Sequence, residues 1–82
     1  MMLTVEVLKR QNGMHCTVSE VAICCDPEGL EYLISRLEFL RGKSEHLHLM
    51  TPSWAGEGLS EQKQGGEDYE LVNHLRIVHR HQ

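Results

Sequence analysis

Histidine is the residue type in this chain best suited to chemistry near neutral pH, because it can bind a metal ion or carry a proton there. His46 and His48 stand two residues apart in an alternating stretch, so their imidazoles would project from one side of a strand, about 7 Å apart at the backbone. His74 could join them from a neighbouring strand. Three imidazoles with one open position are the ligand set of many catalytic zinc sites. One hypothesis is therefore a metal site formed by His46, His48 and His74.

The same strand face could instead bind a protein. Met50 would lie beside the histidines, and Trp54, the only tryptophan in the chain, follows closely. Apolar side chains rimmed by polar ones mark interaction surfaces, and tryptophan is enriched among the residues that dominate binding energy. In a third interpretation nothing is bound: the loop folds back, Trp54 covers the face and the histidines hydrogen-bond to it. The residues alone leave these three interpretations open.

An irregular stretch from 52 to 68 carries the tryptophan and several acidic residues. It spans roughly 17 residues, and connections longer than about 12–15 residues in a compact domain tend to be functional or disordered. Its carboxylates could form an acidic rim around the tryptophan. The rim would consist of Glu57, Glu61, Glu67 and Asp68.

The composition argues against several function classes. The formal charge of −4 and the lack of a stripe rich in Lys and Arg argue against nucleic-acid binding. No serine or cysteine lies in a recognisable nucleophile motif. Gly56 and Gly58 do not form a phosphate loop, because no Gly-Lys-Ser/Thr follows them and Glu57 would repel phosphate. We therefore expect neither enzymatic activity nor a cofactor.

The N-terminal residues and the cysteines predict where the protein acts. Residues 1–7 are too short for the apolar segment of a signal peptide, and Glu6 interrupts them. No run of about 18 apolar residues exists, so we expect no membrane association. The three cysteines are an odd number, and the adjacent Cys24 and Cys25 would rarely form a relaxed disulfide. These features predict a cytoplasmic protein.

Two alternating stretches flank the turn signal Asn12-Gly13 and predict a β-hairpin. Centred on this turn, the pairing places Val7 opposite Val18. The alternation slips near Ser19, after which the apolar residues again occupy inward positions. The slip predicts a β-bulge that resets the register.

The following segment carries the signals of an amphipathic helix. Asp26 can cap it, Pro27 suits its first position, Arg41 would lie in its last turn, and Gly42 would end it. Its apolar stripe would consist of Leu30, Leu33, Ile34, Leu37 and Leu40.

Two further strands complete the expected fold. "EHLHLMT" alternates up to Pro52, and "DYELVNHLRIVHRH" is typical of one long final strand, in which Val72 would share the face of the histidines. The apolar residues that would pack under the helix are Leu47, Leu49, Leu75 and Ile77. The order strand, strand, helix, strand, strand predicts an α+β fold, a two-layer sandwich of one four-stranded sheet with one helix on one face. We expect a single domain over residues 1–82, with the irregular loop at about 52–68.

The run "HLHLMTPSWAGEGLSEQ", followed by "LVNHLRI", resembles the immunity protein 32 family of bacterial polymorphic toxin systems. The resemblance covers roughly residues 20–78. It implies a short α+β protein that protects its producer by binding and occluding a cognate toxin domain, without catalysis. Where that family tends to have paired glycines after the tryptophan, this chain has Ala55-Gly56, and alanine tolerates a positive φ poorly.

The resemblance favours the protein-binding interpretation of the open strand face. We then expect the toxin to contact Trp54, His46, His48, Met50, His74, Glu57 and Glu61. The negative net charge would steer the protein toward a basic toxin. Two alternatives stay open: a small metal-binding or catalytic domain that uses the three histidines, and a homodimeric structural protein that stacks two such faces.

Overall fold

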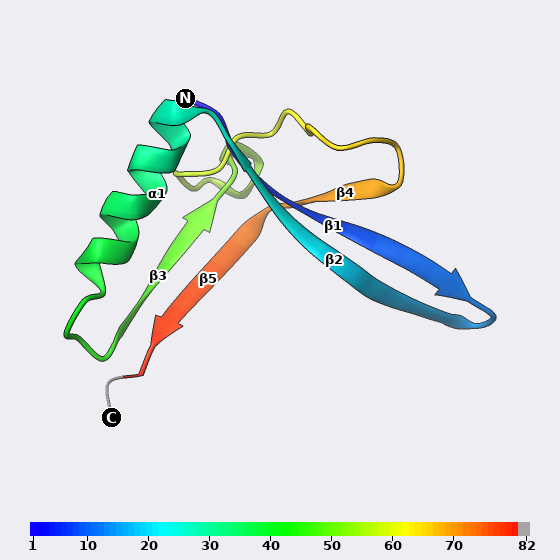
Figure 1. The fold of residues 1–82 in the computed structure, drawn as a ribbon, viewed down its shortest axis with the longest axis horizontal. Coiled ribbons are helices and arrows are strands. Elements are labelled where there is room, and N and C mark those ends of the chain that lie inside the picture. The colour runs from blue at the N-terminus through cyan, green and yellow to red at the C-terminus, as the bar shows by residue number, and fades with distance from the viewer. Residues whose placement is uncertain (81–82) are drawn as a thin grey trace.

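The computed structural model describes residues 1–80, which form five β-strands, one α-helix and one short 3-10 helix (Figure 1). In chain order the elements are β1 (Leu3–Asn12), β2 (His15–Cys25), α1 (Pro27–Phe39), β3 (Glu45–Met50), η1 (Pro52–Trp54), β4 (Tyr69–Val72) and β5 (His74–His79). The α+β class, the single α-helix of this part of the chain and its place after the first two strands are as predicted. None of the helices described is long and apolar enough to cross a membrane.

The strands form two sheets, so the prediction of one four-stranded sheet is wrong. The first sheet has the order β2-β1-β4 and the second pairs β3 with β5, and every pairing is antiparallel. Figure 1 shows the two sheets diverging from the point where β1, β2 and β5 meet.

The division arises at Asn73, where the predicted long final strand breaks into β4 and β5. The Thr51 backbone N–H donates to the Asn73 carbonyl at 3.0 Å, and the Thr51 hydroxyl donates to Asn73 Oδ1 at 2.7 Å. The chain bends there, so β4 follows β1 whereas β5 follows β3. Val72 consequently lies opposite Val5 and packs against the core, and its predicted place beside the histidines is wrong.

The β1–β2 hairpin contains the predicted bulge but not the predicted turn. Asn12 pairs with His15, so the two turn residues are Gly13, at φ +65°, and Met14. Val7 therefore lies opposite Val21 and not opposite Val18.

The bulge lies at Ser19, as predicted. Leu8 pairs with Glu20 while the next residue, Lys9, pairs with Val18, which leaves Ser19 as the extra residue. The Ser19 hydroxyl donates to the Leu8 carbonyl at 3.2 Å. The bulge shifts the register by one residue, but Val21 and Ile23, which the alternation places inward, remain 60% and 49% exposed, so that part of the prediction is wrong.

The helix begins as predicted and ends slightly earlier. The Asp26 carboxylate accepts from the Gly29 backbone N–H at 2.6 Å, and Pro27 occupies the first turn. The helix ends at Phe39, so Arg41 lies beyond it, and Gly42 adopts φ +73° in the following turn.

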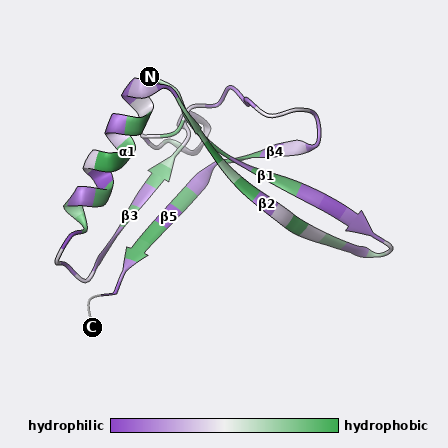
Figure 2. Cartoon of the chain, viewed as in Figure 1, coloured by the Kyte–Doolittle hydropathy of each residue, from purple (hydrophilic) through white to green (hydrophobic). Residues whose placement is uncertain are grey.

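The core lies where the helix meets β1 and β3. Its buried apolar residues are Leu3, Val5, Leu40, Leu47, Leu49 and Leu59, and Leu75 and Ile77 are partly buried against them, as the alternation predicted for β3 and β5. The helix stripe is less buried than predicted, because Leu30, Ile34 and Leu37 remain 46%, 43% and 44% exposed. The outer end of β1 is hydrophilic (Figure 2).

A buried carboxylate fastens the long loop to the second face of the three-stranded sheet. Glu6 is fully buried, and its carboxylate accepts from the Thr4 hydroxyl at 2.6 Å and from the backbone N–H groups of Gln64 and Gly65 at 2.9 and 2.8 Å. Burial raises the pKa of Glu6, but these hydrogen bonds, with one from Cys24, more than offset it, so the pKa is lowered. The loop therefore covers the face of β1 that alternation alone assigns to solvent.

Thr51→Val should lower the free energy of unfolding by about 1–3 kcal/mol, because it keeps the volume of a fully buried side chain but leaves Asn73 Oδ1 without its donor. Urea unfolding followed by circular dichroism measures the change. Thr17→Val, on the exposed outer part of β2, is the matched control and should change stability by less than about 0.5 kcal/mol. Equal stabilities of the two variants would contradict the role given to Thr51.

Candidate protein-binding face

The two-stranded sheet presents one face to solvent. In its register His46 lies opposite Val78, His48 opposite Arg76 and Met50 opposite His74, and side chains directly opposite each other share a face. The histidine face consists of these six residues: His46, His48, Met50, His74, Arg76 and Val78. Met50 is partly buried and the other five are exposed, whereas Leu47 and Leu49 on the reverse side are buried. The predicted grouping of the three histidines with Met50 on an open face is confirmed.

The imidazoles of this face contact one another. His48 Nδ1 lies 2.6 Å from His74 Nε2, and the rings of His46 and His48 meet edge to face with centroids 5.0 Å apart. One nitrogen of the His48–His74 pair must accept, so at least one of the two rings is neutral in this arrangement. Partial desolvation lowers the pKa of His48, and the positive charges of His74, His46 and Arg76 lower it further.

The hydrogen bond between His48 and His74 bears on the metal hypothesis. Within residues 1–80, no group of three or more His, Cys, Asp or Glu side chains is arranged to hold a metal ion. A metal bound by both rings would have to replace their mutual hydrogen bond. The site of His46, His48 and His74 stays a prediction without support from this geometry.

Trp54 stands at the border of the histidine face and is not a lid over it. Its side chain is 56% exposed, and its ring centroid lies 6.2 Å from that of His74. The 3-10 turn that carries it closes through hydrogen bonds from the Trp54 N–H to the Thr51 carbonyl, at 3.0 Å, and from the Ala55 N–H to the Pro52 carbonyl, at 2.8 Å. The backbone of Trp54 is thus held in place, whereas its indole ring is exposed to solvent.

The loop after the tryptophan packs tightly under this turn. A Cβ at Gly56 would lie 2.3 Å from Met50 Cβ, so only glycine fits there. Ala55 adopts φ +57°, and it is the only non-glycine residue of those described with a positive φ. The alanine that departs from the paired glycines of the resembled family therefore occupies the conformation that favours glycine.

The predicted acidic residues differ in their surroundings. The Glu61 carboxylate accepts from the Ser53 backbone N–H, and hydrogen bonds from Ser53 lower its pKa, so this residue holds the turn of Trp54 in place. The Glu57 side chain is exposed, and its carbonyl accepts from the Met50 N–H at 2.9 Å. Glu67 and Asp68 immediately precede β4, a strand of the other sheet.

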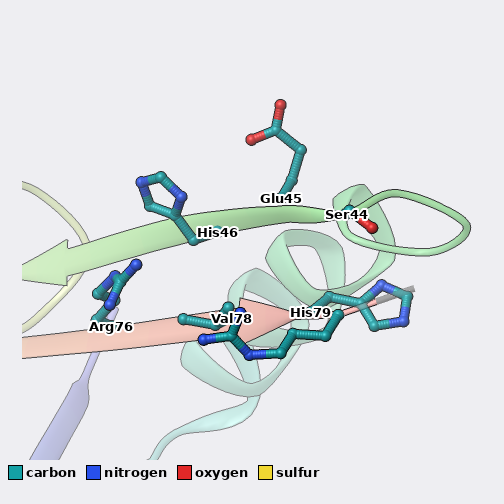
Figure 3. A pocket seen from close by; sticks show the side chains of 7 residues that line it. Ser44, Glu45, His46, Arg76, Val78 and His79 are labelled. Carbon is teal, nitrogen blue, oxygen red and sulfur yellow. The ribbon is translucent and has the colours of Figure 1, made fainter. Parts of the chain in front are cut away.

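The sequence analysis did not include two arginines among the site residues. Arg76 and Arg80 line a surface pocket of about 320 Å³ at the end of the histidine face, together with Ser44, Glu45, His46, Val78 and His79 (Figure 3). The alternation of β5 places Arg76 beside His74 and could have identified it. The position of Arg80 depends on where the strand ends, which the pattern does not show. The pocket gives this end of the face a cationic character.

The family model described as immunity protein 32 matches residues 20–75. The chain belongs to the immunity protein 32 family. The match extends from the bulge region of β2 to the start of β5, and it includes Thr51, Trp54 and Asn73. No curated protein and no solved structure matches the chain. Membership of an immunity protein family suggests a toxin-neutralising role, and such families generally act without catalysis.

Ala55→Gly should raise the free energy of unfolding by about 0.5–1 kcal/mol, because glycine adopts the positive φ of this position without steric cost. Thermal and urea unfolding measure the gain. Ala22→Gly in β2 is the matched control, and it should lower stability by a similar amount, since glycine weakens a strand. A loss of stability in Ala55→Gly would show that the turn does not need this conformation.

The pKa of His48 should lie below its ordinary 6.5 in the folded protein and should rise in His74→Gln, because that variant removes one positive charge beside it. A pKa lowered by folding contributes stability that is present above about pH 6.5 and is lost as the pH falls through the folded-state value. NMR titration of the imidazole protons measures the shift. Arg10→Gln, at the far end of β1, should leave the His48 pKa unchanged, and an unshifted pKa in His74→Gln would contradict the coupling.

Proposed function

We propose that this chain is a non-enzymatic immunity protein that binds and neutralises a cognate toxin domain of a polymorphic toxin system in the cytoplasm. The toxin would contact the histidine face and Trp54, with Glu57 at the margin. Family membership supports the general role. The observation that supports the site is an exposed tryptophan held at the border of an uncovered sheet face.

Contacts within the protein itself hold the turn of Trp54. The Glu61 carboxylate accepts a hydrogen bond from the Ser53 N–H, and the Thr51 carbonyl accepts one from the Trp54 N–H. Gly56 packs against the Met50 side chain. Binding would therefore cost less ordering entropy at the backbone of this residue, which favours an effective anchor. A tryptophan in that state can insert into a pocket of the partner and dominate the binding energy.

The pocket at the end of the histidine face carries two arginines, whereas the whole chain has a negative net charge. A net charge of −4 favours encounter with a basic toxin. The pocket beside Arg76 and Arg80, in contrast, suits a carboxylate of the partner. A toxin surface that is basic overall and places one acidic side chain near its centre would match both features.

Trp54→Ala should weaken binding of the toxin domain at least about 30-fold, which corresponds to roughly 2 kcal/mol. Calorimetry with a catalytically inactivated form of the toxin domain encoded next to this chain measures the affinity. Met14→Ala is the matched control, because this side chain is 98% exposed at the hairpin tip and lies outside the proposed site. If both variants bind as the wild type does, the site is assigned wrongly; if the wild type does not bind, the neighbouring toxin is not the partner.

A further inference from the structure

Among residues 1–80, only one charged side chain, that of Glu6, is fully buried. Taking a carboxylate out of water is costly unless hydrogen bonds to its charged form offset the cost. The donors to Glu6 are the Thr4 hydroxyl, the Cys24 side chain and the backbone N–H groups of Gln64 and Gly65. Two of these donors stand 58 and 59 residues further along the chain. The buried charge therefore holds a distant part of the loop against β1.

A second contact fastens the same loop to the start of β1. The Ser60 N–H donates to the Leu3 carbonyl at 2.7 Å, and the Leu3 N–H donates to Ser60 Oγ at 3.1 Å. Residues 60–65 are thus attached to β1 at both of their ends, by Leu3 at one end and by Glu6 at the other. We call residues 60–65 the strap. In Figure 1 the strap is the yellow segment that precedes β4.

The strap reaches the turn of Trp54 through Glu61, which lies between the two attachment points. The first N–H groups of a helical turn have no acceptor within the turn and need one from outside. The side chain of Thr51, the residue before the turn, does not supply it, because its hydroxyl bonds to Asn73. The Glu61 carboxylate supplies it by accepting from the Ser53 N–H. The position of the Trp54 turn therefore depends on where the strap holds Glu61.

Hydrogen bonds, and not apolar burial, hold the far end of the strap. The side chains of residues 61–64 are exposed, and no helix or strand includes them. Lys63 Nζ donates to the Tyr69 carbonyl at 2.7 Å, but this contact is open to solvent. The bonds to Glu6 are made to an ionised group that water does not reach, and hydrogen bonds of this kind are the strong ones. Glu6 is thus the principal attachment of this end of the strap.

The strap fits closely against the sheet at the glycine that donates to Glu6. A Cβ at Gly65 would lie 2.7 Å from Tyr69 Cγ and 3.0 Å from Glu6 Oε1. The position of a Cβ at Gly66, in contrast, has no heavy atom within 4 Å. Any side chain at residue 65 would therefore push the strap away from Glu6, whereas one at residue 66 would not.

We infer that Glu6 is a positioning residue for toxin binding. Glu6 holds the strap, the strap holds Glu61, and Glu61 supports the turn that presents Trp54. Glu6 belongs to the three-stranded sheet and is buried, so it acts on the histidine face without contacting the toxin. This inference rests on the proposed function, because its consequence for the protein is a change in toxin affinity.

Gly65→Ala should weaken binding of the inactivated toxin domain about tenfold, because the turn of Trp54 would lose part of its support and would have to be ordered on binding. Gly66→Ala is the matched control and should bind as the wild type does, since its Cβ meets no other atom. Calorimetry measures both affinities.

The fluorescence of Trp54, the only tryptophan, measures the same connection without toxin. The anisotropy of its emission should fall in Gly65→Ala, and the Ser53 amide should exchange faster with solvent deuterium. Glu6→Gln should have both effects, because its amide group replaces an acceptor oxygen with a donor. Thr4→Val should lower stability but leave both signals unchanged, since it removes a hydrogen bond of Glu6 that does not involve the strap.

Equal Trp54 anisotropy and equal Ser53 exchange in Gly65→Ala and Gly66→Ala would overturn the inference, whether or not the toxin binds. A loss of toxin affinity that is the same in Glu6→Gln and Thr4→Val would also overturn it, because Glu6 would then have only a structural role. A wild type that does not bind the toxin domain contradicts the proposed function. In that case, an anisotropy change confined to Glu6→Gln and Gly65→Ala still supports the connection between Glu6 and Trp54.

Discussion

The bend at Asn73 determines where the other parts of the protein lie. Two hydrogen bonds from Thr51 hold it, one from the backbone and one from the hydroxyl, and Thr51 is fully buried. Water competes poorly at such a position, so the pair keeps its full strength. On one side of the bend β4 extends the sheet of β1, and on the other β5 pairs with β3. The histidine face, and the place of Trp54 at its border, depend on this change of sheet.

Sequence patterns predicted the features that depend on near neighbours. The cap at Asp26, the bulge at Ser19 and the shared face of His46 and His48 each follow from a few adjacent residues. The bend at Asn73 does not, because its partner Thr51 is 22 residues away and strand-like residues continue on both sides of it. The only local sign is a polar side chain in a position that alternation assigns to the core.

Glu6 is a second residue whose surroundings the sequence pattern does not predict. Its place in the alternation of β1 assigns it to solvent, yet it is fully buried, because residues 64 and 65 fold across it and donate two backbone hydrogen bonds. Alternation with a period of two shows on which side of a strand a residue lies, but it does not show what covers that side. The site was predictable to a similar degree: the histidines and Trp54 could be grouped from the sequence, but the roles of Glu61 and Arg80 depend on the path of the loop and the end of β5.

The two surfaces of the β3–β5 sheet have opposite chemistry because successive residues of β5 point to opposite sides. Arg76 and Val78 contribute to the polar histidine face, whereas Ile77 lines a pocket of about 350 Å³ with Leu37 and Leu40 at the end of the helix. The two surfaces meet at the end of the strand, because Val78 and His79 line pockets on both of them, so a partner bound on one surface would contact residues that also border the other.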